Sequence, residues 1–407
     1  MNEPIPQKRQ AALGFIFATL FIDIMGLAII IPVIPKLIEY LVHTNNASVA
    51  SVYAIWLTVA YAVMQFIFAP LIGNLSDKYG RRPVLLCSLL GFSVDYMFSA
   101  FAPTIGLLFI GRVVAGITGA SFTTASAYIA DISTPEKRAA NFGLVGVAFG
   151  LGFIIGPVIG GILGHYDIHY PFIAAGGLAL LNAAYGYFIL PESLAPEHRR
   201  PLDYKKINPF TSILQLKKYQ SVIGLAVSIF LIYFAAQAVQ STWTYYTIYK
   251  FNWNETTIGI SLGVVGLLTA AVQGGLIRIV IPKIGQERSI WIGLLMYAAG
   301  LVLFAFANQA WMMYAFLVPY CLGGIAGPAI QGYMSTSVPA NEQGNLQGSL
   351  TGLMSISSIL GPLVMLGSFH YFTQPNPYFQ FAGMPFLIGA ALMLLSALLA
   401  IRSFKRK

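Results

Sequence analysis

The chain has 407 residues, of which 57% are hydrophobic and only 9% are charged. Soluble globular proteins carry about 25% charged residues, so this composition excludes a water-soluble enzyme, and the high hydrophobic fraction excludes a long disordered chain. The net charge of +9 would suit a nucleic-acid-binding protein only if the basic residues gathered on one wetted surface.

Successive apolar segments predict an all-α membrane protein with twelve transmembrane helices. Because one span needs about 20 apolar residues, twelve would occupy about 240 residues. The expected spans are 11–40, 51–72, 83–101, 104–130, 139–164, 170–190, 221–249, 256–281, 289–306, 309–337, 345–370 and 380–402. The first is too long for a signal-peptide core and lacks a small-residue cleavage site, so we expect it to remain in the mature protein.

The basic residues predict the orientation of these spans. Twenty of the 23 Lys and Arg residues lie in terminal or connecting segments, or at the end of a span, that would share one side of the membrane. Lys36 and Lys250 fall on the other side, and Arg112 falls within a span. Since cytoplasmic segments are enriched in Lys and Arg, we expect both termini in the cytoplasm. The positive charge is a topology signal, and no nucleic-acid partner is expected.

An internal repeat divides the chain into an N-terminal six-helix half at 1–190 and a C-terminal six-helix half at 221–407. The cytoplasmic linker between them, 191–220, is the only long polar connection. Secondary transporters are commonly built from such repeats, which rock about a central site, whereas a channel does not require them. The pairs about 205 residues apart are Gly80 with Gly285, Gly143 with Gly348, and Gly156-Pro157 with Gly361-Pro362.

A membrane-embedded enzyme is the alternative class. It would need a convergent cluster of catalytic or metal-ligating side chains. The five histidines, His43, His165, His169, His198 and His370, lie in loops or near span ends without such spacing. We therefore expect no enzyme activity, no metal site and no cofactor. Cys87 and Cys321 lie far apart within apolar segments, and we expect both to be small core residues.

Three charged residues, Asp23, Asp95 and Arg112, are predicted deep within spans. A charge at the bilayer centre costs at least about 2.5 to 3.5 kcal/mol on insertion scales, so each suggests a function. Asp95 could carry protons, or it could be a structural carboxylate bonded to a neighbouring helix. Arg112 could hold an acid ionised, or it could form a purely structural pair. Asp23 could titrate, or it could cap a helix kinked by Pro32 and Pro35.

Neutral polar residues take the place of charges in the second half. Its three acids, Glu255, Glu287 and Glu342, fall outside the expected spans. Side chains that recur at helical spacing in the seventh span are Tyr233, Gln237, Gln240 and Thr244. Such a face suits a solute-binding site. Gln65 and Gln331 are further candidates, although for each residue alone a contact between helices is an equal alternative.

Several motifs resemble the major facilitator superfamily. GNLSDKYGRRP at 73–83 resembles the loop between its second and third spans, and GRVVAGITGA at 111–120 resembles its fourth-span signature. GLGFIIGPVIGG at 150–161 resembles the fifth-span motif of antiporters. The match runs through most of the chain, and its pattern is most similar to the bacterial tetracycline/proton antiporter family, which belongs to the twelve-span drug:proton antiporters.

The resemblance implies roles for particular residues. Asp23, Asp95 and Arg112 match membrane-embedded functional positions, and Gln65 would lie near the solute path. Gly156 and Pro157 would form a close-packed, bendable interface between the halves. The other positions implied in the cytoplasmic gate are Gly73, Asp77, Gly80, Arg81, Arg82 and Asp131.

The sequence also departs from the family. Thr269 and Tyr297 stand where tetracycline exporters carry a His in the eighth span and an Asp in the ninth. This argues against a metal-chelated tetracycline as the solute and leaves Asp23 and Asp95 as the main proton candidates. We expect an antiporter of the inner membrane that works as a monomer, uses the proton gradient and exports a small amphipathic organic solute. A proton-coupled symporter that takes up such a solute is the alternative.

Overall fold

The computed structural model of the chain describes residues 7–119, 121–133, 138–199, 223–336, 343–375 and 379–404. Over these ranges the regular secondary structure is entirely helical, which confirms the predicted fold class. The elements are α1 (Gln7–Ile29), α2 (Ile34–Val42), α3 (Ala47–Tyr79), α4 (Arg81–Phe101), α5 (Ile105–Thr118), α6 (Ser121–Ile132), α7 (Arg138–Tyr166), α8 (Tyr170–Ile189), the 3-10 helix η1 (Pro196–His198), α10 (Ile223–Gln240), α11 (Trp243–Phe251), α12 (Glu255–Ala271), the π-helix η4 (Val272–Leu276), α13 (Ile277–Ile284), α14 (Gln286–Phe306), α15 (Ala310–Leu322), the 3-10 helix η5 (Gly323–Ile325), α16 (Ala326–Thr336), α17 (Gln343–Thr373) and α18 (Met384–Phe404). Glu342 and most of the predicted linker at 191–220 lie outside the described residues.

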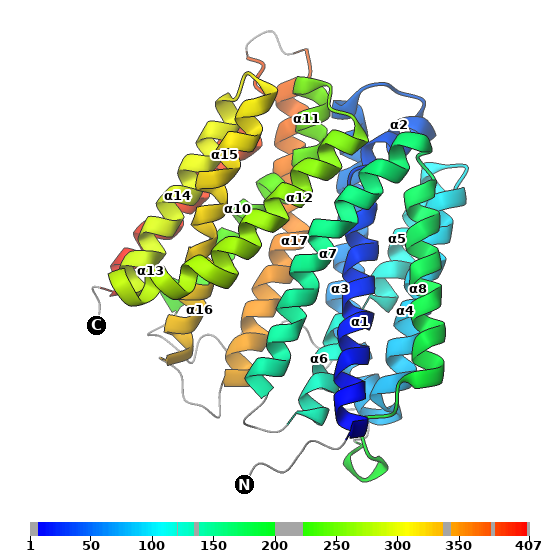
Figure 1. Cartoon of the computed structure of the whole chain (residues 1–407). Coiled ribbons are helices and arrows are strands. Elements are labelled where there is room, and N and C mark those ends of the chain that lie inside the picture. Colours follow the sequence, from blue (N-terminus) through cyan, green and yellow to red (C-terminus); the bar gives the residue numbers. More distant parts are fainter. Residues whose placement is uncertain are drawn as a thin grey trace. The chain divides into compact units, whose positions relative to one another are not determined.

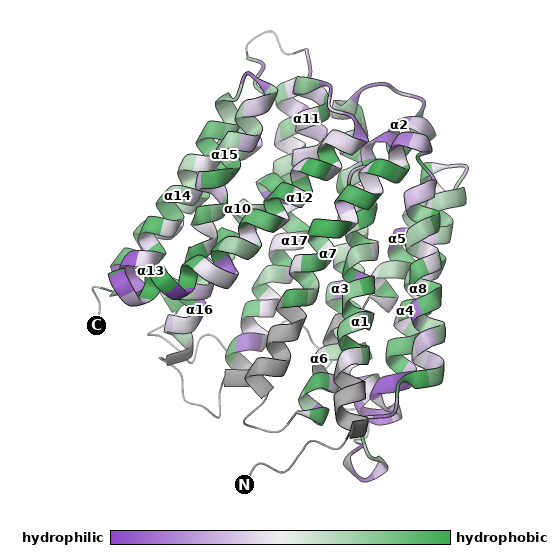
Figure 2. Ribbon diagram, viewed as in Figure 1, coloured by the Kyte–Doolittle hydropathy of each residue, from purple (hydrophilic) through white to green (hydrophobic). Residues whose placement is uncertain are grey.

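Most of these helices have the length and apolar character of membrane spans. Ten described helices, counted with their direct continuations, could each cross a membrane, and the bent pair formed by 14–29 and 34–42 raises the number to eleven. The expected span at 104–130 is split into α5, which has 14 residues, and α6. Figure 2 shows hydrophobic residues along the helices and hydrophilic residues gathered near many helix ends. The chain is a multi-pass membrane protein, and the twelve-span count stays a prediction.

The first predicted span bends where its prolines lie. A turn at residues 30–33 separates α1 from α2, and the two helices are bent by 46°. Pro32 and Pro35 lack the backbone N–H that a continuous helix would use, and their rings clash with the preceding turn. The predicted kink is confirmed. Asp23 lies well inside α1 rather than at its broken end, where a capping residue would stand.

Backbone contacts divide the chain into two compact units. Unit 1 comprises 1–37, 60–208 and 254–263, and unit 2 comprises 38–59, 209–253 and 264–407. Each unit therefore includes a short stretch from the other predicted half. In unit 1 this follows from close packing, because a Cβ on Gly161 of α7 would collide with the carbonyl oxygen of Glu255 at the start of α12. The division into halves at 1–190 and 221–407 stays a prediction.

Unit 1 is assembled around α1. This helix packs against α7 and α8, and α4 packs against α5, α6 and α8 (Figure 1). α1 and α7 approach closely, since a Cβ on Gly160 would collide with the carbonyl oxygen of Ile29. One buried core cluster comprises Phe15, Ile16, Leu20, Ile24, Leu85, Ala125, Tyr128, Ile129, Ala148 and Leu190.

Unit 2 has an aromatic core. In it α10 packs against α17 and α18, and α14 packs against α15 and α18. The ring centroids of Trp243 and Phe304 are 5.1 Å apart, and those of Tyr246 and Phe386 are 4.8 Å apart. The Tyr246 hydroxyl also donates a hydrogen bond of 2.8 Å to the carbonyl oxygen of Phe304. These rings bury apolar area while the hydroxyl keeps a polar partner.

The start of α3 belongs to unit 2 because side chains of α17 hold it. His370 Nδ1 lies 2.8 Å from the carbonyl oxygen of Ser48, and Thr373 Oγ1 lies 2.5 Å from Ser48 Oγ. Both contacts join the first turn of α3 to the last turns of α17. A segment of the predicted N-terminal half is thereby packed with helices of the predicted C-terminal half.

Two glycines related by the predicted repeat have the same backbone conformation. Gly80 has φ +107° and Gly285 has φ +84°, and they are the only glycines with positive φ among the described residues. Each directly precedes a 21-residue helix, α4 or α14. Glycine adopts positive φ without the steric penalty of a Cβ atom, so both loops use it to turn into the next helix.

The two cysteines differ in burial. Cys321 is buried, as expected from its apolar surroundings. Cys87 is exposed on α4, so the expectation that it is a core residue is wrong. An apolar stretch in a membrane protein contains residues that face lipid as well as residues that face the core, and hydropathy does not separate the two.

Candidate transport and gating sites

A buried ion pair joins α4 to α5. Arg112 Nη2 lies 2.5 Å from Asp95 Oδ2 and also donates a hydrogen bond of 3.2 Å to Ser99 Oγ. The Asp95 side chain is 1% exposed and that of Arg112 is 14% exposed. Charges so far from water are stable only when paired with good geometry, and removal of one partner leaves the other uncompensated. The structure thus brings together two of the three predicted embedded charges.

Glycines allow the two helices to come close enough for this pair. A Cβ on Gly111 of α5 would stand 3.0 Å from Asp95 Oδ1, and a Cβ on Gly91 of α4 would collide with the side chain of Thr118. Small residues at such crossings let helix backbones approach in membranes. The fourth-span motif therefore supplies packing as well as the arginine.

Gln65 bonds to the point where α5 gives way to α6. Its Nε2 donates hydrogen bonds to the carbonyl oxygen of Gly119, at 3.0 Å, and to the Tyr61 hydroxyl, at 3.2 Å. Gly119 lies at the break between the helices, so its carbonyl gains a side-chain partner there. These contacts give Gln65 a role between helices, and its contact with solute stays a prediction.

Tyr61 and Tyr96 were not among the sequence candidates. The side chain of Tyr96 is 1% exposed, and Asp23, Asp95, Arg112 and Tyr61 all lie within electrostatic range of its hydroxyl. Asp23 is also buried, with 8% exposure. The chain has 22 tyrosines, so residue type alone does not distinguish these two. Their only sequence signal is that Tyr96 directly follows Asp95 and that Tyr61 precedes Gln65 by one helical turn.

A second charge cluster surrounds Arg81 at the start of α4. Its Nη1 lies 2.5 Å from Asp77 Oδ1 and donates a hydrogen bond of 2.6 Å to Ser76 Oγ. Its Nε donates to Asp131 Oδ2 at 3.1 Å. Asp131 Oδ2 also accepts a hydrogen bond of 3.0 Å from Ser193 Oγ. The structure places both predicted gate acids, Asp77 and Asp131, in contact with Arg81.

Glu192 completes this cluster, although the sequence indicated it only as part of a linker. Its Oε1 accepts a hydrogen bond of 2.9 Å from the Arg81 backbone N–H, and its Oε2 accepts one of 3.2 Å from the Arg82 backbone N–H. A Cβ on Gly80 would collide with this carboxylate. A negative charge at a helix N-terminus is favourable because the free N–H groups there carry partial positive charge.

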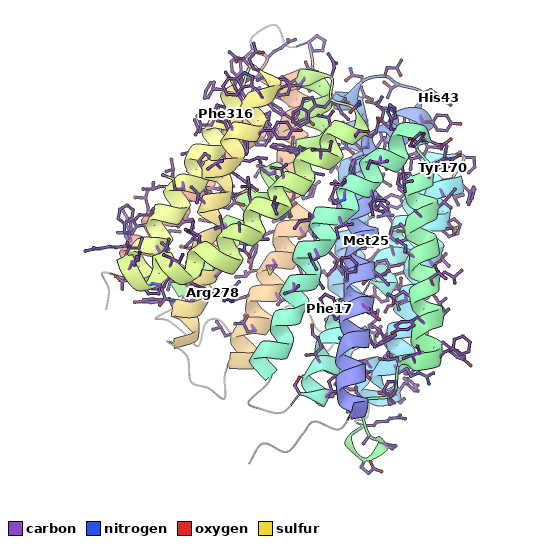
Figure 3. All side chains as sticks on the ribbon, in the orientation of Figure 1. Phe17, Met25, His43, Tyr170, Arg278 and Phe316 are labelled. Atoms are coloured by element: carbon purple, nitrogen blue, oxygen red, sulfur yellow. The ribbon has the colours of Figure 1, made fainter. Side chains whose placement is uncertain are left out.

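The remaining gate candidates differ in their surroundings. Arg82 Nη2 donates a hydrogen bond of 2.5 Å to the carbonyl oxygen of Tyr187. A Cβ on Gly73 would meet nothing within 4 Å, so packing in this conformation does not require glycine there. A Cβ on Gly156 would stand 2.7 Å from Ala28 Cβ and 2.8 Å from the carbonyl oxygen of Met25. Figure 3 marks Met25 on α1, and Gly156 lies on α7, where Pro157 follows it.

The predicted polar face of the seventh span is interrupted. α10 ends at Gln240, a turn occupies 241–242, and Thr244 belongs to α11. Tyr233 accepts a hydrogen bond of 2.9 Å at its hydroxyl from Gln331 Nε2, which joins α10 to α16. Gln237 instead bonds locally, because its Nε2 donates to Gln240 Oε1 at 3.3 Å. The structure pairs Tyr233 with Gln331 and does not align all four residues on one helix.

Neutral contacts surround the two positions that depart from the family. Thr269 Oγ1 lies 3.8 Å from Cys321 Sγ, and the Tyr297 hydroxyl donates a hydrogen bond of 3.1 Å to the Tyr320 hydroxyl. Over the described part of the chain, no group of three His, Cys, Asp or Glu residues could hold a metal ion. At Thr269 and Tyr297 the second half thus presents neutral groups, namely two hydroxyls with a thiol and a further hydroxyl as their partners.

Comparison with known proteins assigns the family. The model of the Major Facilitator Superfamily matches residues 16–362 and, in a second match, 225–407. The chain belongs to the major facilitator superfamily. Among curated members, the tetracycline resistance protein of class C from Escherichia coli is 39% identical over 95% of the chain and 96% of that protein. The class G protein from Vibrio anguillarum is 37% identical over 84% of the chain and 86% of that protein. These relatives confirm the predicted resemblance.

Solved structures confirm the major facilitator fold. The human organic anion transporter MFSD10 is 22% identical, with a TM-score of 0.72 over 96% of this chain and 99% of that one. The nucleoside transporter NupG, solved as a point mutant, is 12% identical, with a TM-score of 0.74 over 97% of this chain and 100% of that one. At such identities the likeness concerns the fold alone.

Proposed function

We propose that the chain is a proton-coupled antiporter that exports a small amphipathic organic solute by alternating access. Relatives named as tetracycline resistance proteins are 33% to 39% identical over 84% to 95% of the chain, which supports a drug exporter of this superfamily. The observation that carries the proton-coupled part is the buried Asp95–Arg112 pair. Ionisable groups inside a membrane mark proton and substrate pathways, because they are costly to keep there.

Asp95 would be the proton-carrying group. While ionised it is paired with Arg112, and the pair carries no net charge. When Asp95 takes up a proton, the attraction to the guanidinium weakens, and Arg112, which keeps its hydrogen bond to Ser99, becomes free to bind the solute. Each protonation state would then favour a different arrangement of α4 and α5. Solute binding from the cytoplasm would favour release of the proton, and protonation from outside would favour release of the solute.

The Arg81 cluster would act as the cytoplasmic gate. Asp77 of α3, Asp131 of α6 and Glu192 of the predicted linker all contact Arg81 at the start of α4. Such a cluster can form in one conformation and separate in the other. We propose that the halves at 1–190 and 221–407 rock about a central site, with Gly156 and Pro157 at a bendable interface and both termini in the cytoplasm.

The solute site would use neutral polar groups of the second half. Tyr233 and Gln331 already form a hydrogen bond between two helices, and each could exchange it for a bond to solute. Thr269 and Tyr297 offer hydroxyl groups rather than carboxylate or imidazole ligands. An organic molecule that accepts hydrogen bonds and has an apolar body fits these side chains better than a metal chelate does.

Everted membrane vesicles provide the test. Respiration acidifies the vesicle lumen and quenches a pH-sensitive dye, and tetracycline with or without Mg²⁺, or ethidium, is then added outside. An exporter should release lumenal protons, seen as dequenching, with at least one of these probes. Asp95→Asn should abolish the response, whereas Asp167→Asn, which changes a partly exposed loop acid, should retain it. If the Asp95→Asn variant still gave full dequenching, Asp95 would not be the proton-carrying residue. A symporter would give no dequenching when solute is added outside the everted vesicles.

A further inference from the structure

Two neighbouring residues of α4 carry buried polar atoms without a hydrogen-bond partner. Over the described residues, Asp95 Oδ1 and Tyr96 Oη are both inaccessible to solvent and lack any such partner. Leaving a buried polar group unsatisfied costs about 1 to 3 kcal/mol, so each case in a folded protein needs an explanation. One explanation is that the atom finds its partner during the working cycle.

The surroundings of Tyr96 indicate what that partner is. Charged or titratable groups lie within electrostatic range of its hydroxyl on four helices: Asp23 on α1, Tyr61 on α3, Asp95 on α4 and Arg112 on α5. The Tyr96 phenol is therefore placed among both embedded acids, whereas the Arg112 guanidinium forms its salt bridge with Asp95.

The hydroxyl of Tyr96 faces α1 at Gly26, one helical turn from Asp23. A Cβ on Gly26 would stand 3.5 Å from Tyr96 Oη, so the hydroxyl lies against the backbone of α1 at that residue. Gly26 and Asp23 are three residues apart in the same helix and therefore share a face of it. Because Gly26 has no side chain, no Cβ atom stands against the hydroxyl on this side.

The second phenol near these acids, that of Tyr61, already has a hydrogen-bond partner. Tyr61 Oη accepts a hydrogen bond of 3.2 Å from Gln65 Nε2, which also holds the Gly119 carbonyl. A hydroxyl anchored in this way reorients less readily than one without a bond. Tyr96 is therefore the better placed of the two to change partners.

We infer that the Tyr96 hydroxyl is the group through which protons pass between Asp95 and Asp23, an inference that rests on the proposed proton-coupled function. The transfer conserves charge on the phenol. An O–H bond of the protonated acid breaks as its proton joins a lone pair of the phenol oxygen, directly or through a water molecule. The phenol's own O–H bond breaks as its proton passes to the second carboxylate. Tyr96 is neutral before and after, so its hydroxyl passes the proton on without storing charge.

Tyr96→Phe removes only the hydroxyl, and Tyr245→Phe is its matched control. Tyr245 is also buried, its Oη also has no hydrogen-bond partner among the described residues, and the charged group within electrostatic range of it is Glu39. Removing an unsatisfied buried hydroxyl should leave stability unchanged or raise it. Both variants should therefore fold, which thermal unfolding of the purified proteins would verify.

Two measurements in the same vesicles test the inference. Probe-driven proton release, with tetracycline or ethidium, should slow at least about tenfold in Tyr96→Phe, as loss of a proton-transferring group would predict, and stay at the wild-type rate in Tyr245→Phe. Exchange of labelled for unlabelled probe at equal pH needs no net proton movement and should stay within about twofold of wild type. Gly26→Ala, which places a methyl group 3.5 Å from the hydroxyl and limits its reorientation, should also slow proton release.

The possible results separate the two proposals. If the wild-type protein releases protons and Tyr96→Phe does so at the same rate, the relay is wrong and the antiporter stands. If exchange falls in parallel with proton release in Tyr96→Phe, the residue is structural and the relay is also wrong. If the wild-type protein releases no protons with any probe, the antiporter proposal fails, and the relay through Tyr96, which depends on it, fails as well.

Discussion

The carboxylate of Glu192 caps α4 through the backbone N–H of Arg81, at 2.9 Å. The same carboxylate accepts hydrogen bonds of 3.0 Å from the backbone N–H groups of Ser193 and Leu194, so it also orders the chain that follows. One side chain thus ties the end of the first six predicted spans to the charge cluster at the start of α4. A movement that displaces the linker would have to break these bonds.

Replacement of Glu192 by Ala should destabilise the protein by about 1 kcal/mol, the usual cost of losing a helix cap. Four backbone N–H groups lose their acceptor: two at the start of α4, and those of Ser193 and Leu194, which directly follow Glu192. Thermal unfolding in detergent would measure the effect. Glu197→Ala, an exposed acid in the same segment, is the control, and equal stability of the two variants would show that Glu192 does not cap the helix.

The sequence predicted the fold and the positions of the charged residues better than it predicted the residues with which those charges interact. Hydropathy gave the helices, because a bilayer demands long apolar runs, and the rarity of embedded charges singled out Asp95 and Arg112. Glu192 was missed because its partner, Arg81, lies 111 residues away. No local spacing records such a contact.

Helix interruptions were also hidden in the sequence. The polar face predicted from Tyr233 to Thr244 assumed one straight helix, yet a turn at 241–242 separates α10 from α11. Residues 241–242 are Ser and Thr, which occur in both helices and turns. The helical spacing therefore describes the chain as far as Gln240 and fails beyond it. The break between α1 and α2, in contrast, was predictable from Pro32 and Pro35.

Arg112→Ala should be more harmful than the double variant Asp95→Asn with Arg112→Ala. The single change leaves a buried carboxylate without its cation, which typically costs about 3 to 5 kcal/mol, whereas the double change removes both charges. Neither variant should couple solute to protons in everted vesicles. Thermal unfolding in detergent would rank the stabilities. A double variant no more stable than Arg112→Ala would mean that the uncompensated Asp95 carboxylate is not what destabilises the single variant.

Gly160→Ala should destabilise the protein strongly, while Gly150→Ala should be neutral or stabilising. Both glycines lie in α7, but a Cβ on Gly160 would collide with the backbone carbonyl of Ile29, whereas a Cβ on Gly150 would meet nothing within 4 Å. In an open helical position Ala is favoured over Gly by about 1 kcal/mol. The comparison of unfolding temperatures isolates the helix contact from helix propensity, and equal losses in both variants would contradict close packing of α1 on α7.

Asp167 should make a small, pH-dependent contribution to stability. The backbone N–H of His169 donates to its Oδ1 at 2.8 Å, and this bond, with a further one from the His169 ring, lowers the pKa of the Asp167 carboxyl below its usual value. A carboxyl with a lowered pKa in the folded state stabilises the protein above its unfolded pKa of about 3.9 and loses that effect as pH falls through the folded pKa.

Because the Asp167 side chain is 44% exposed, the contribution should be only a few tenths of a kcal/mol. The unfolding temperature of Asp167→Asn should thus be slightly below that of wild type at pH 6, and the gap should close toward pH 3. The backbone donor is the larger cause of the shift, so the gap should persist in a His169→Ala background. A gap that widens on acidification would have the opposite sign and would refute the bond as the source of the effect.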